Sequence, residues 1–94
     1  MNIRFYMDPE TGQPHIQEHG VMEEDVRQIL VGRGDEFPGA GKARIRFGKT
    51  LAGRYLKVIF VPDLERDSIF VITAYDLRGK ALRAFRRRQR RRSR

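Results

Sequence analysis

The chain has 94 residues, of which 39% are hydrophobic and 34% are charged, and its formal net charge is +8 at neutral pH. A chain of this length has enough apolar side chains for one small core but not for two. It contains no cysteine, which excludes disulfides and thiolate metal sites. The absence of cysteine suits a reducing compartment, and we expect a cytoplasmic protein.

The sequence has no feature that predicts contact with a membrane. Residues 1–8 lack the basic stretch and the apolar run of a signal peptide. The longest apolar runs, Val58–Val61 and Ile69–Ile72, have four residues each, whereas a membrane-spanning helix needs about 20. We therefore expect no membrane partner.

Charge is segregated along the chain. Residues 1–36 carry three arginines and eight acidic residues, and residues 37–61 carry six basic residues and no acidic one. Residues 62–77 carry one arginine and four acidic residues, whereas residues 78–94 carry ten basic residues and no acidic one. Such segregation is typical of proteins that bind nucleic acid or another polyanion.

The N-terminal third predicts a strand followed by helices. Ile3–Met7 is apolar and aromatic and is ended by Asp8-Pro9, which indicates a strand. Residues 15–19 predict one helical turn closed by Gly20. An amphipathic helix is expected from Met22 to Leu30 or Val31, because apolar residues recur there at helical spacing after an acidic first turn.

Three strands are expected next, after a glycine-rich link at residues 38–41. Lys42–Gly48 alternates basic and apolar residues, and Arg54–Val61 is largely apolar on both faces. Ser68–Tyr75 is rich in β-branched and aromatic residues. A polar loop at residues 62–67 is expected to join the last two strands.

The C-terminal end predicts a helix and a tail. Asp76 is expected to cap a helix that runs to Phe85. No apolar residue follows Phe85, so residues 86–94 are expected to form a disordered basic tail. The sequence therefore predicts one α+β domain at residues 1–85, with an antiparallel sheet of about four strands and helices packed on it.

Several kinds of site have no match in the sequence. It contains no P-loop, no dinucleotide-binding glycine motif and no Cys/His zinc spacing. His15 and His19 have the spacing of a two-histidine metal site. However, Glu18 precedes the second histidine, whereas metalloprotease helices place a glutamate directly after the first. Two partly exposed histidines on a short helix are the favoured interpretation, and we expect no metal ion and no cofactor.

A basic strand face is the main candidate for a binding site. Lys42, Arg44 and Arg46 are expected to project from one face of a strand, with Arg54 and Lys57 on the next strand. Such a face can bind the phosphates of RNA or another polyanion. An ordinary solvated face is the alternative interpretation.

The C-terminal arginines favour the binding interpretation. Arg83, Arg86 and Arg87 begin a run of bases that is expected to add electrostatic affinity for nucleic acid. An acidic membrane surface is less favoured, because no large apolar residue accompanies the arginines after Phe85. Tyr75 is an aromatic residue of the kind that stacks on unpaired bases.

The sequence also contains the groups that RNA cleavage without a metal ion requires. The 2′-hydroxyl must lose a proton, the leaving oxygen must gain one, and cations must stabilise the charged phosphorane. Histidine suits either proton transfer, and arginine binds phosphate through two hydrogen bonds. The residues that offer these groups are His15, His19, Arg44, Arg46, Arg54, Tyr75 and Arg83.

Three segments, taken in order, resemble the BrnT toxin family. His19-Gly20-Val21 followed by the acid-rich residues 22–26 resembles that family's "KHGV-sFEEA" segment, and also an "H…RGI-seeDV" segment of uncharacterised domains. Phe47–Val58 is similar to its "G…GR-L-V-V" hairpin. Val71–Tyr75 followed by a basic helix resembles its "RIISAR" strand and arginine-rich end. Together the segments span most of residues 15–92.

The resemblance implies a RelE-like fold and a metal-independent ribonuclease toxin that a partner antitoxin silences. It places His19, Arg54 and the Thr73–Tyr75 strand end at the family's motif positions, and His19, Arg54 and Tyr75 are the candidate catalytic residues. Glu18 departs from the family's pattern because a lysine precedes its histidine. The segment at Phe5–Pro9 also lacks the family's tryptophan, and the family's long first helix is shortened here.

Three functional hypotheses follow from these observations. The first is an RNA-directed protein of the BrnT or RelE type, in which His19 transfers a proton. The second is a non-catalytic module that binds nucleic acid or an acidic protein through the same cations. The third is an interaction subunit whose arginine tail becomes ordered only against an acidic partner. The sequence favours no particular oligomeric state.

Overall fold

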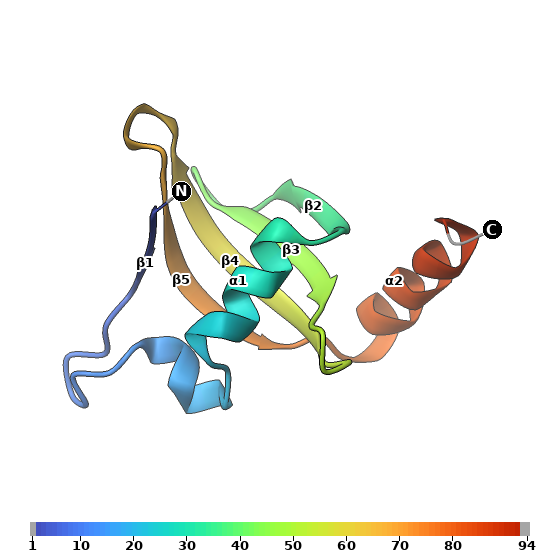
Figure 1. Cartoon of the computed structure of the whole chain (residues 1–94), viewed down its shortest axis with the longest axis horizontal. Helices are drawn as coiled ribbons and strands as arrows, with labels where there is room; N and C mark the ends of the chain where they lie inside the picture. Colours follow the sequence, from blue (N-terminus) through green and yellow to red (C-terminus); the bar gives the residue numbers. More distant parts are fainter. Residues whose placement is uncertain (1, 93–94) are drawn as a thin grey trace.

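The computed structural model describes residues 2–92, which form a five-stranded sheet with helices on both faces (Figure 1). The α+β class that the sequence predicts is therefore confirmed. The elements, in which η marks a 3-10 helix, are β1 (Asn2–Phe5), η1 (His15–His19), α1 (Glu23–Val31), β2 (Gly34–Pro38), β3 (Arg44–Lys49), β4 (Tyr55–Asp63), η2 (Leu64–Arg66), β5 (Ser68–Asp76) and α2 (Gly79–Arg92).

The sheet is mixed, and its strand order is β1-β5-β4-β3-β2. The pairs β2–β3, β3–β4 and β4–β5 are antiparallel. β1 instead pairs in parallel with β5, with Ile3 opposite Ile69. The expectation of an antiparallel sheet of about four strands is therefore wrong in both the strand count and the pairing. The partner of β1 is β5, which lies more than 60 residues later in the sequence. A local sequence pattern does not predict this pairing.

The strand that the sequence did not predict is β2. Glycine, aspartate, glutamate and proline are all depleted in strands, and they supply four of its five residues. β2 is an edge strand, the position where proline is tolerated. A Cβ atom at Gly34 would lie 2.1 Å from the carbonyl oxygen of Phe47, so only glycine allows this close pairing. Pairing with β3 thus outweighs the weak local preference.

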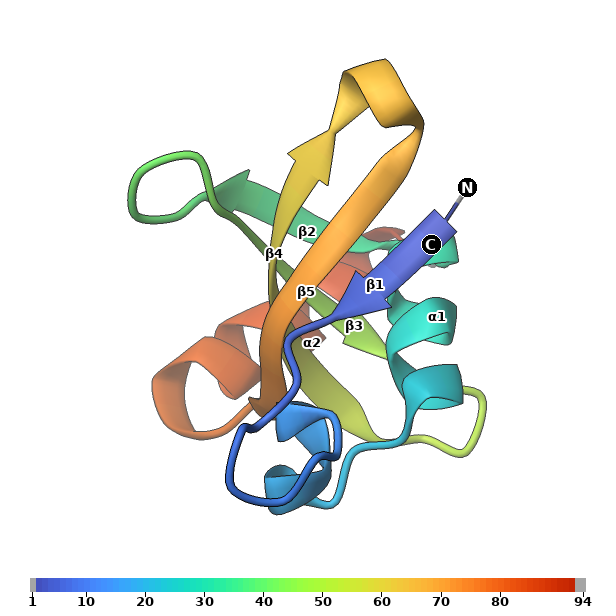
Figure 2. The ribbon, with the colours of Figure 1, turned by 90° about the vertical axis from the view of Figure 1, so that its left-hand side faces the viewer.

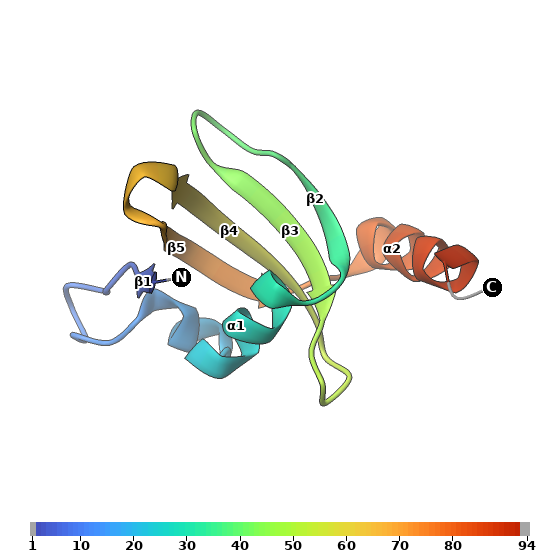
Figure 3. The same cartoon turned by 45° about the horizontal axis from the view of Figure 1, so that its top comes forward.

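The main core lies between the sheet and the helices η1 and α1, and Figure 3 shows α1 lying across the strands. The predicted helix from Met22 is confirmed with bounds Glu23–Val31. The Asp25 carboxylate accepts a hydrogen bond from the Met22 backbone N–H at 3.0 Å, which satisfies one free donor at the start of the helix. The fully buried side chains of this core include Ile16, Val21, Val26, Ile29, Leu56, Val58 and Val71.

The helix α2 covers part of the opposite face of the sheet. Phe85 is fully buried, with its ring edge-on to Phe47 and Tyr55 at centroid distances of 6.2 and 6.1 Å. α2 begins at Gly79 and not at Asp76, which is the last residue of β5. Phe47, Phe85 and Leu77 form a second, smaller core. Leu77 precedes the turn into α2 and Phe85 follows it, so the chain is held on both sides of this turn.

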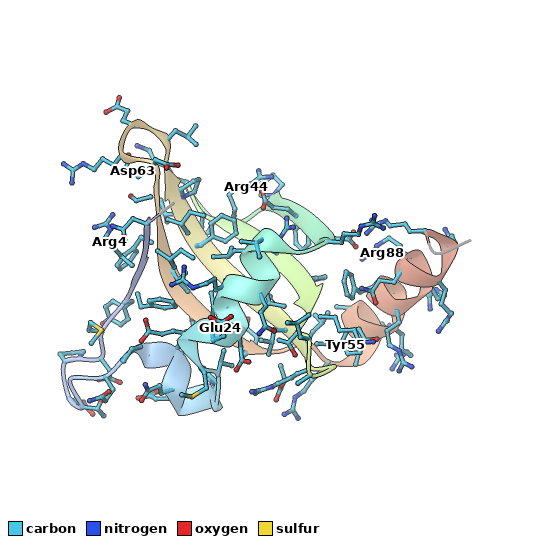
Figure 4. All side chains as sticks on the ribbon, in the orientation of Figure 1. Arg4, Glu24, Arg44, Tyr55, Asp63 and Arg88 are labelled. Atoms are coloured by element: carbon cyan, nitrogen blue, oxygen red, sulfur yellow. The ribbon has the colours of Figure 1, made fainter. Side chains whose placement is uncertain are left out.

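The expected disordered tail is wrong for residues 86–92, which continue α2. Arg88 and Arg92 lie one helical turn apart and both form ion pairs with Asp35 of β2. Figure 4 shows Arg88 extending from α2 toward the sheet. The ion pairs with Asp35 thus stabilise the helix beyond Phe85. The pattern of apolar residues in the sequence does not predict them. Residues 93–94 of the predicted tail lie outside the described residues.

Within residues 2–92, no helix has the length and the apolar composition that crossing a membrane requires.

Candidate functional site

A pocket of about 780 Å³ lies where η1, the start of β4, the end of β5 and the start of α2 meet. Figure 2 shows η1 and the first turns of α2 on either side of the end of β5. Lys57 and Tyr75 are cross-strand partners, so their side chains leave the sheet on the same face. Both line the pocket, together with His15, His19 and Thr73.

The pocket brings two of the predicted catalytic residues together. The His19 ring lies 5.6 Å from the Tyr75 ring, measured between centroids, and 5.5 Å from the ring of His15. The ammonium group of Lys57 lies 5.5 Å from the centroid of the Tyr75 ring. Among the described residues, Lys57 has no carboxylate partner, so its charge is available to a ligand. Proton carriers and a cation therefore share one cavity.

Arg54, the third predicted catalytic residue, contacts the main chain of η1. Its Nε donates to Oδ1 of Asp76 at 2.7 Å, its Nη1 donates to the Gly20 carbonyl oxygen at 2.6 Å, and its Nη2 donates to the His19 carbonyl oxygen at 3.0 Å. The hydrogen bond to Asp76 raises the pKa of Arg54, and the same bond lowers the pKa of Asp76. Arg54 thus fixes the segment that carries His19.

The end of η1 has a backbone that suits this contact. Gly20 has φ +67°, in the left-handed region that favours glycine, and this turn closes the 3-10 helix after His19. The turn directs the carbonyl oxygens of His19 and Gly20 toward the guanidinium of Arg54. The resemblance implied a match at His19 and Arg54, and the structure joins the two through the backbone of His19.

The predicted basic face is divided between the two faces of the sheet. Arg46 is opposite Val58 and lies under the end of α1, where its Nε donates to the Ile29 carbonyl oxygen at 2.9 Å. Arg44 and Arg46 both form ion pairs with Glu36, at 3.4 and 3.2 Å. Lys57 is on the other face, in the pocket. Arg44 and Arg46 therefore hold the fold together and do not line the pocket.

Lys42 and the arginines of α2 form the remaining part of the predicted binding set. Lys42 is exposed in the turn before β3. Arg83, Arg86 and Arg87 are exposed on α2, and Arg86 lies over the Tyr55 ring at 5.8 Å. Helical spacing places further cations on the same exposed side, which we call the cationic side of α2: Lys80, Arg83, Arg86, Arg87, Arg90 and Arg91. None of these six has a carboxylate partner among residues 2–92.

Arg78 is a cation at the pocket that was not singled out from the sequence. Its Nη2 is 3.3 Å from Oδ2 of Asp76. Thr73 contributes a buried hydroxyl oxygen that has no hydrogen-bond partner in the described part of the chain. A signal for Arg78 was present, because it closely follows the strand that carries Tyr75.

Comparison of this chain with protein-family models, with curated protein sequences and with solved structures finds no match.

Proposed function

We propose that this protein acts on RNA as a ribonuclease of the BrnT or RelE-like type that needs no metal ion. The observation that carries the proposal is the placement of His19, Tyr75 and Lys57 in one pocket, with centroid and ammonium distances near 5.5 Å. A titratable imidazole and an unpaired cation in a cleft are the groups that phosphoryl transfer from RNA requires. The start of α2 lines the pocket, and the cationic side of this helix supplies attraction for the phosphate chain.

In the proposed reaction the 2′-oxygen of the RNA attacks the adjacent phosphorus. The imidazole of His19 accepts the proton of the 2′-hydroxyl as the bond from the 2′-oxygen to phosphorus forms. Lys57 and Arg78 stabilise the additional negative charge on the phosphorane. The bond from phosphorus to the 5′-oxygen then breaks, and the Tyr75 hydroxyl donates a proton to that oxygen. The products are a 2′,3′-cyclic phosphate and a 5′-hydroxyl.

Arg54 acts in this proposal as a positioning residue. Its guanidinium makes three hydrogen bonds to protein groups, including both carbonyl oxygens at the end of η1. It contributes by holding His19 beside Tyr75.

The test compares RNA with DNA of the same sequence. Purified protein in EDTA at neutral pH is incubated with an RNA oligonucleotide and with the all-deoxy version, and the ends of the products are determined. The proposal requires cleavage of the RNA alone, with cyclic phosphate ends. Intact RNA after long incubation, together with normal growth of cells that express the protein, would refute it.

The resemblance also motivates a proposed partner and location. Toxins of that family are silenced by an antitoxin, so we propose a small antitoxin as partner of this protein in the cytoplasm. The test is co-expression with the product of an adjacent short gene. Recovery of a complex in which RNA cleavage is suppressed supports the proposal, and cleavage that continues at full rate contradicts it.

A second function is favoured by a different observation, the six cations on the cationic side of α2. A non-catalytic module would use this side and the pocket to bind RNA without cleaving it. Its affinity would fall steeply as salt is added, because counterions are released on binding. RNA that binds with this salt dependence, yet stays intact in the test above, would favour the second function over the first.

A further inference from the structure

Three side chains that the proposed reaction does not use converge beside the pocket. They are Asp8, in the segment after β1, and His15 and Glu18 on η1. Nδ1 of His15 lies 3.8 Å from Oδ2 of Asp8 and 3.5 Å from Oε2 of Glu18. One ligand atom from each residue lies within 4.8 Å of the other two. One nitrogen and two carboxylate oxygens thus face a common point.

The backbone holds these residues in place. The Asp8 N–H donates to the Gln13 carbonyl oxygen at 2.8 Å, and the His15 N–H donates to the Tyr6 carbonyl oxygen at 2.9 Å. A β-bridge between Met7 and Pro14 closes the loop between them. Oδ1 of Asp8 accepts the Glu10 N–H at 2.9 Å, which leaves Oδ2 directed at His15. The three ligand atoms come from a closed loop and the helical turn that follows it, so little rearrangement separates them from a common ion.

The spacing and the donor types match a divalent transition metal. Ligand atoms about 2.1 Å from a tetrahedral Zn²⁺ ion lie about 3.4 Å from one another, close to the separations of the His15 nitrogen from the two carboxylates. One imidazole nitrogen and two carboxylate oxygens are a donor set that zinc accepts, with a fourth position left for water. Mg²⁺ and Ca²⁺ prefer oxygen ligands throughout. The imidazole therefore selects for the transition metal.

The two carboxylates favour a cation at this point. Oδ2 of Asp8 and Oε2 of Glu18 both approach the His15 imidazole, and the ligand atoms of the three residues lie within 4.8 Å of one another. Like charges at this separation repel, and a divalent ion between them removes that repulsion.

We propose that Asp8, His15 and Glu18 form a binding site for a zinc ion. His15 and Glu18 also line the pocket, so the ion lies at its border. The site differs from the pair of histidines that the sequence spacing suggested, because His19 is not one of its ligands. The ion joins the loop after β1 to η1.

The test is calorimetric titration of the chelator-treated, intact protein with zinc chloride at neutral pH. Binding of one ion is expected, and Asp8→Asn and Glu18→Gln should each weaken it at least about tenfold, because each replaces a charged ligand with a neutral amide. Glu24→Gln is the matched control, since Glu24 is an exposed acid on α1 that contacts Arg27 at 3.8 Å. It should bind zinc within about twofold of the native protein.

Nuclear magnetic resonance of the imidazole nitrogens provides a second measurement that does not depend on the variants. Addition of zinc should strongly change the nitrogen chemical shifts of His15. Those of His19 should not show the change expected of a metal ligand. No saturable binding, equal affinity in all variants, or ligand shifts at His19 in place of His15 would each overturn the proposal. The titration contains no RNA, so its outcome is separate from that of the cleavage assay in EDTA.

Discussion

At the scale of single residues, Arg54 has the clearest structural role. Its three hydrogen bonds join β5 to the end of η1, two elements that share no backbone pairing. Arg54→Ala should lower the free energy of unfolding by about 2 kcal/mol, which is less than the sum for three charged hydrogen bonds because the side chain is part-exposed. Chemical denaturation measures this change.

The control for Arg54 is an arginine whose ion pair is exposed. Arg66 pairs with Asp63 at 3.7 Å and is 78% exposed, so Arg66→Ala should leave the free energy of unfolding almost unchanged. Equal effects of the two substitutions would show that Arg54 does not hold η1 in place.

Thr73 is the second residue with a measurable effect, because its side chain buries a polar group. Its buried hydroxyl lacks a hydrogen-bond partner among the described residues, which costs free energy in the absence of a ligand. Thr73→Val keeps the shape of the side chain and removes the hydroxyl, so stability should be unchanged or higher by about 1 kcal/mol. Affinity for RNA, measured by fluorescence anisotropy, should be unchanged, because the hydroxyl oxygen is buried. A less stable variant would mean that the hydroxyl makes a hydrogen bond in the native protein, and weaker RNA binding would mean that it reaches a ligand.

At the scale of elements, the C-terminal end of α2 is held by the carboxylate of Asp35, which pairs with Arg88 and Arg92. Burial alone would raise the pKa of Asp35, but hydrogen bonds from Arg92 and Arg88 outweigh it and lower the pKa below its ordinary value. Asp35→Asn should reduce the free energy of unfolding at neutral pH by about 1 kcal/mol, because its arginine partners are part-exposed. Helix content measured by circular dichroism should fall as the end of α2 frays.

The pH dependence follows from the same lowered pKa. A carboxyl group with a lower pKa in the folded protein stabilises the fold at pH values above its unfolded pKa of about 4. This contribution is lost as the pH falls through the folded pKa. The difference between native protein and Asp35→Asn should therefore be full at pH 7 and disappear in strong acid, as measured by denaturation at several pH values. A difference that is independent of pH would contradict the account.

Elements that follow from a local sequence pattern were predictable. Elements that depend on strand pairing or on ion pairs with residues distant in the sequence were not. The helix at Glu23–Val31 and the strands around Val58 and Val71 follow from apolar periodicity. β2 did not, because its polar residues are ordered by pairing with β3. The continuation of α2 past Phe85 depends on Asp35, a residue far away in the sequence. The sequence likewise predicts Arg46 as a binding residue, whereas in the structure its guanidinium donates to a carbonyl oxygen at the end of α1.

At the scale of the whole molecule, cations that bind RNA should be distinguishable from cations that maintain the fold. Replacing Arg83, Arg86 and Arg87 with glutamine removes three charges from the cationic side of α2. The slope of the logarithm of RNA affinity against the logarithm of salt concentration should become less steep by about 2, at roughly 0.7 for each charge on a single strand. Anisotropy titrations at several salt concentrations measure this slope.

The matched control is Arg44→Gln, because Arg44 is paired with Glu36 outside the pocket. This variant should leave the slope unchanged, whereas a phosphate contact at Arg44 would make its loss reduce the slope by roughly 0.7. An affinity for RNA that does not depend on salt in the native protein would contradict both the catalytic and the non-catalytic proposals.

The most direct test of the central claim is the rate of RNA cleavage by the native protein and by His19→Ala, both in EDTA at neutral pH. His19 is exposed, so its replacement should leave the fold intact, and Gln17→Ala on the same helical turn is the control. We predict that the native protein and Gln17→Ala cleave at the same rate, and that His19→Ala is slower by about 100-fold or more. Equal rates for all three proteins, or no cleavage by any, would contradict the account.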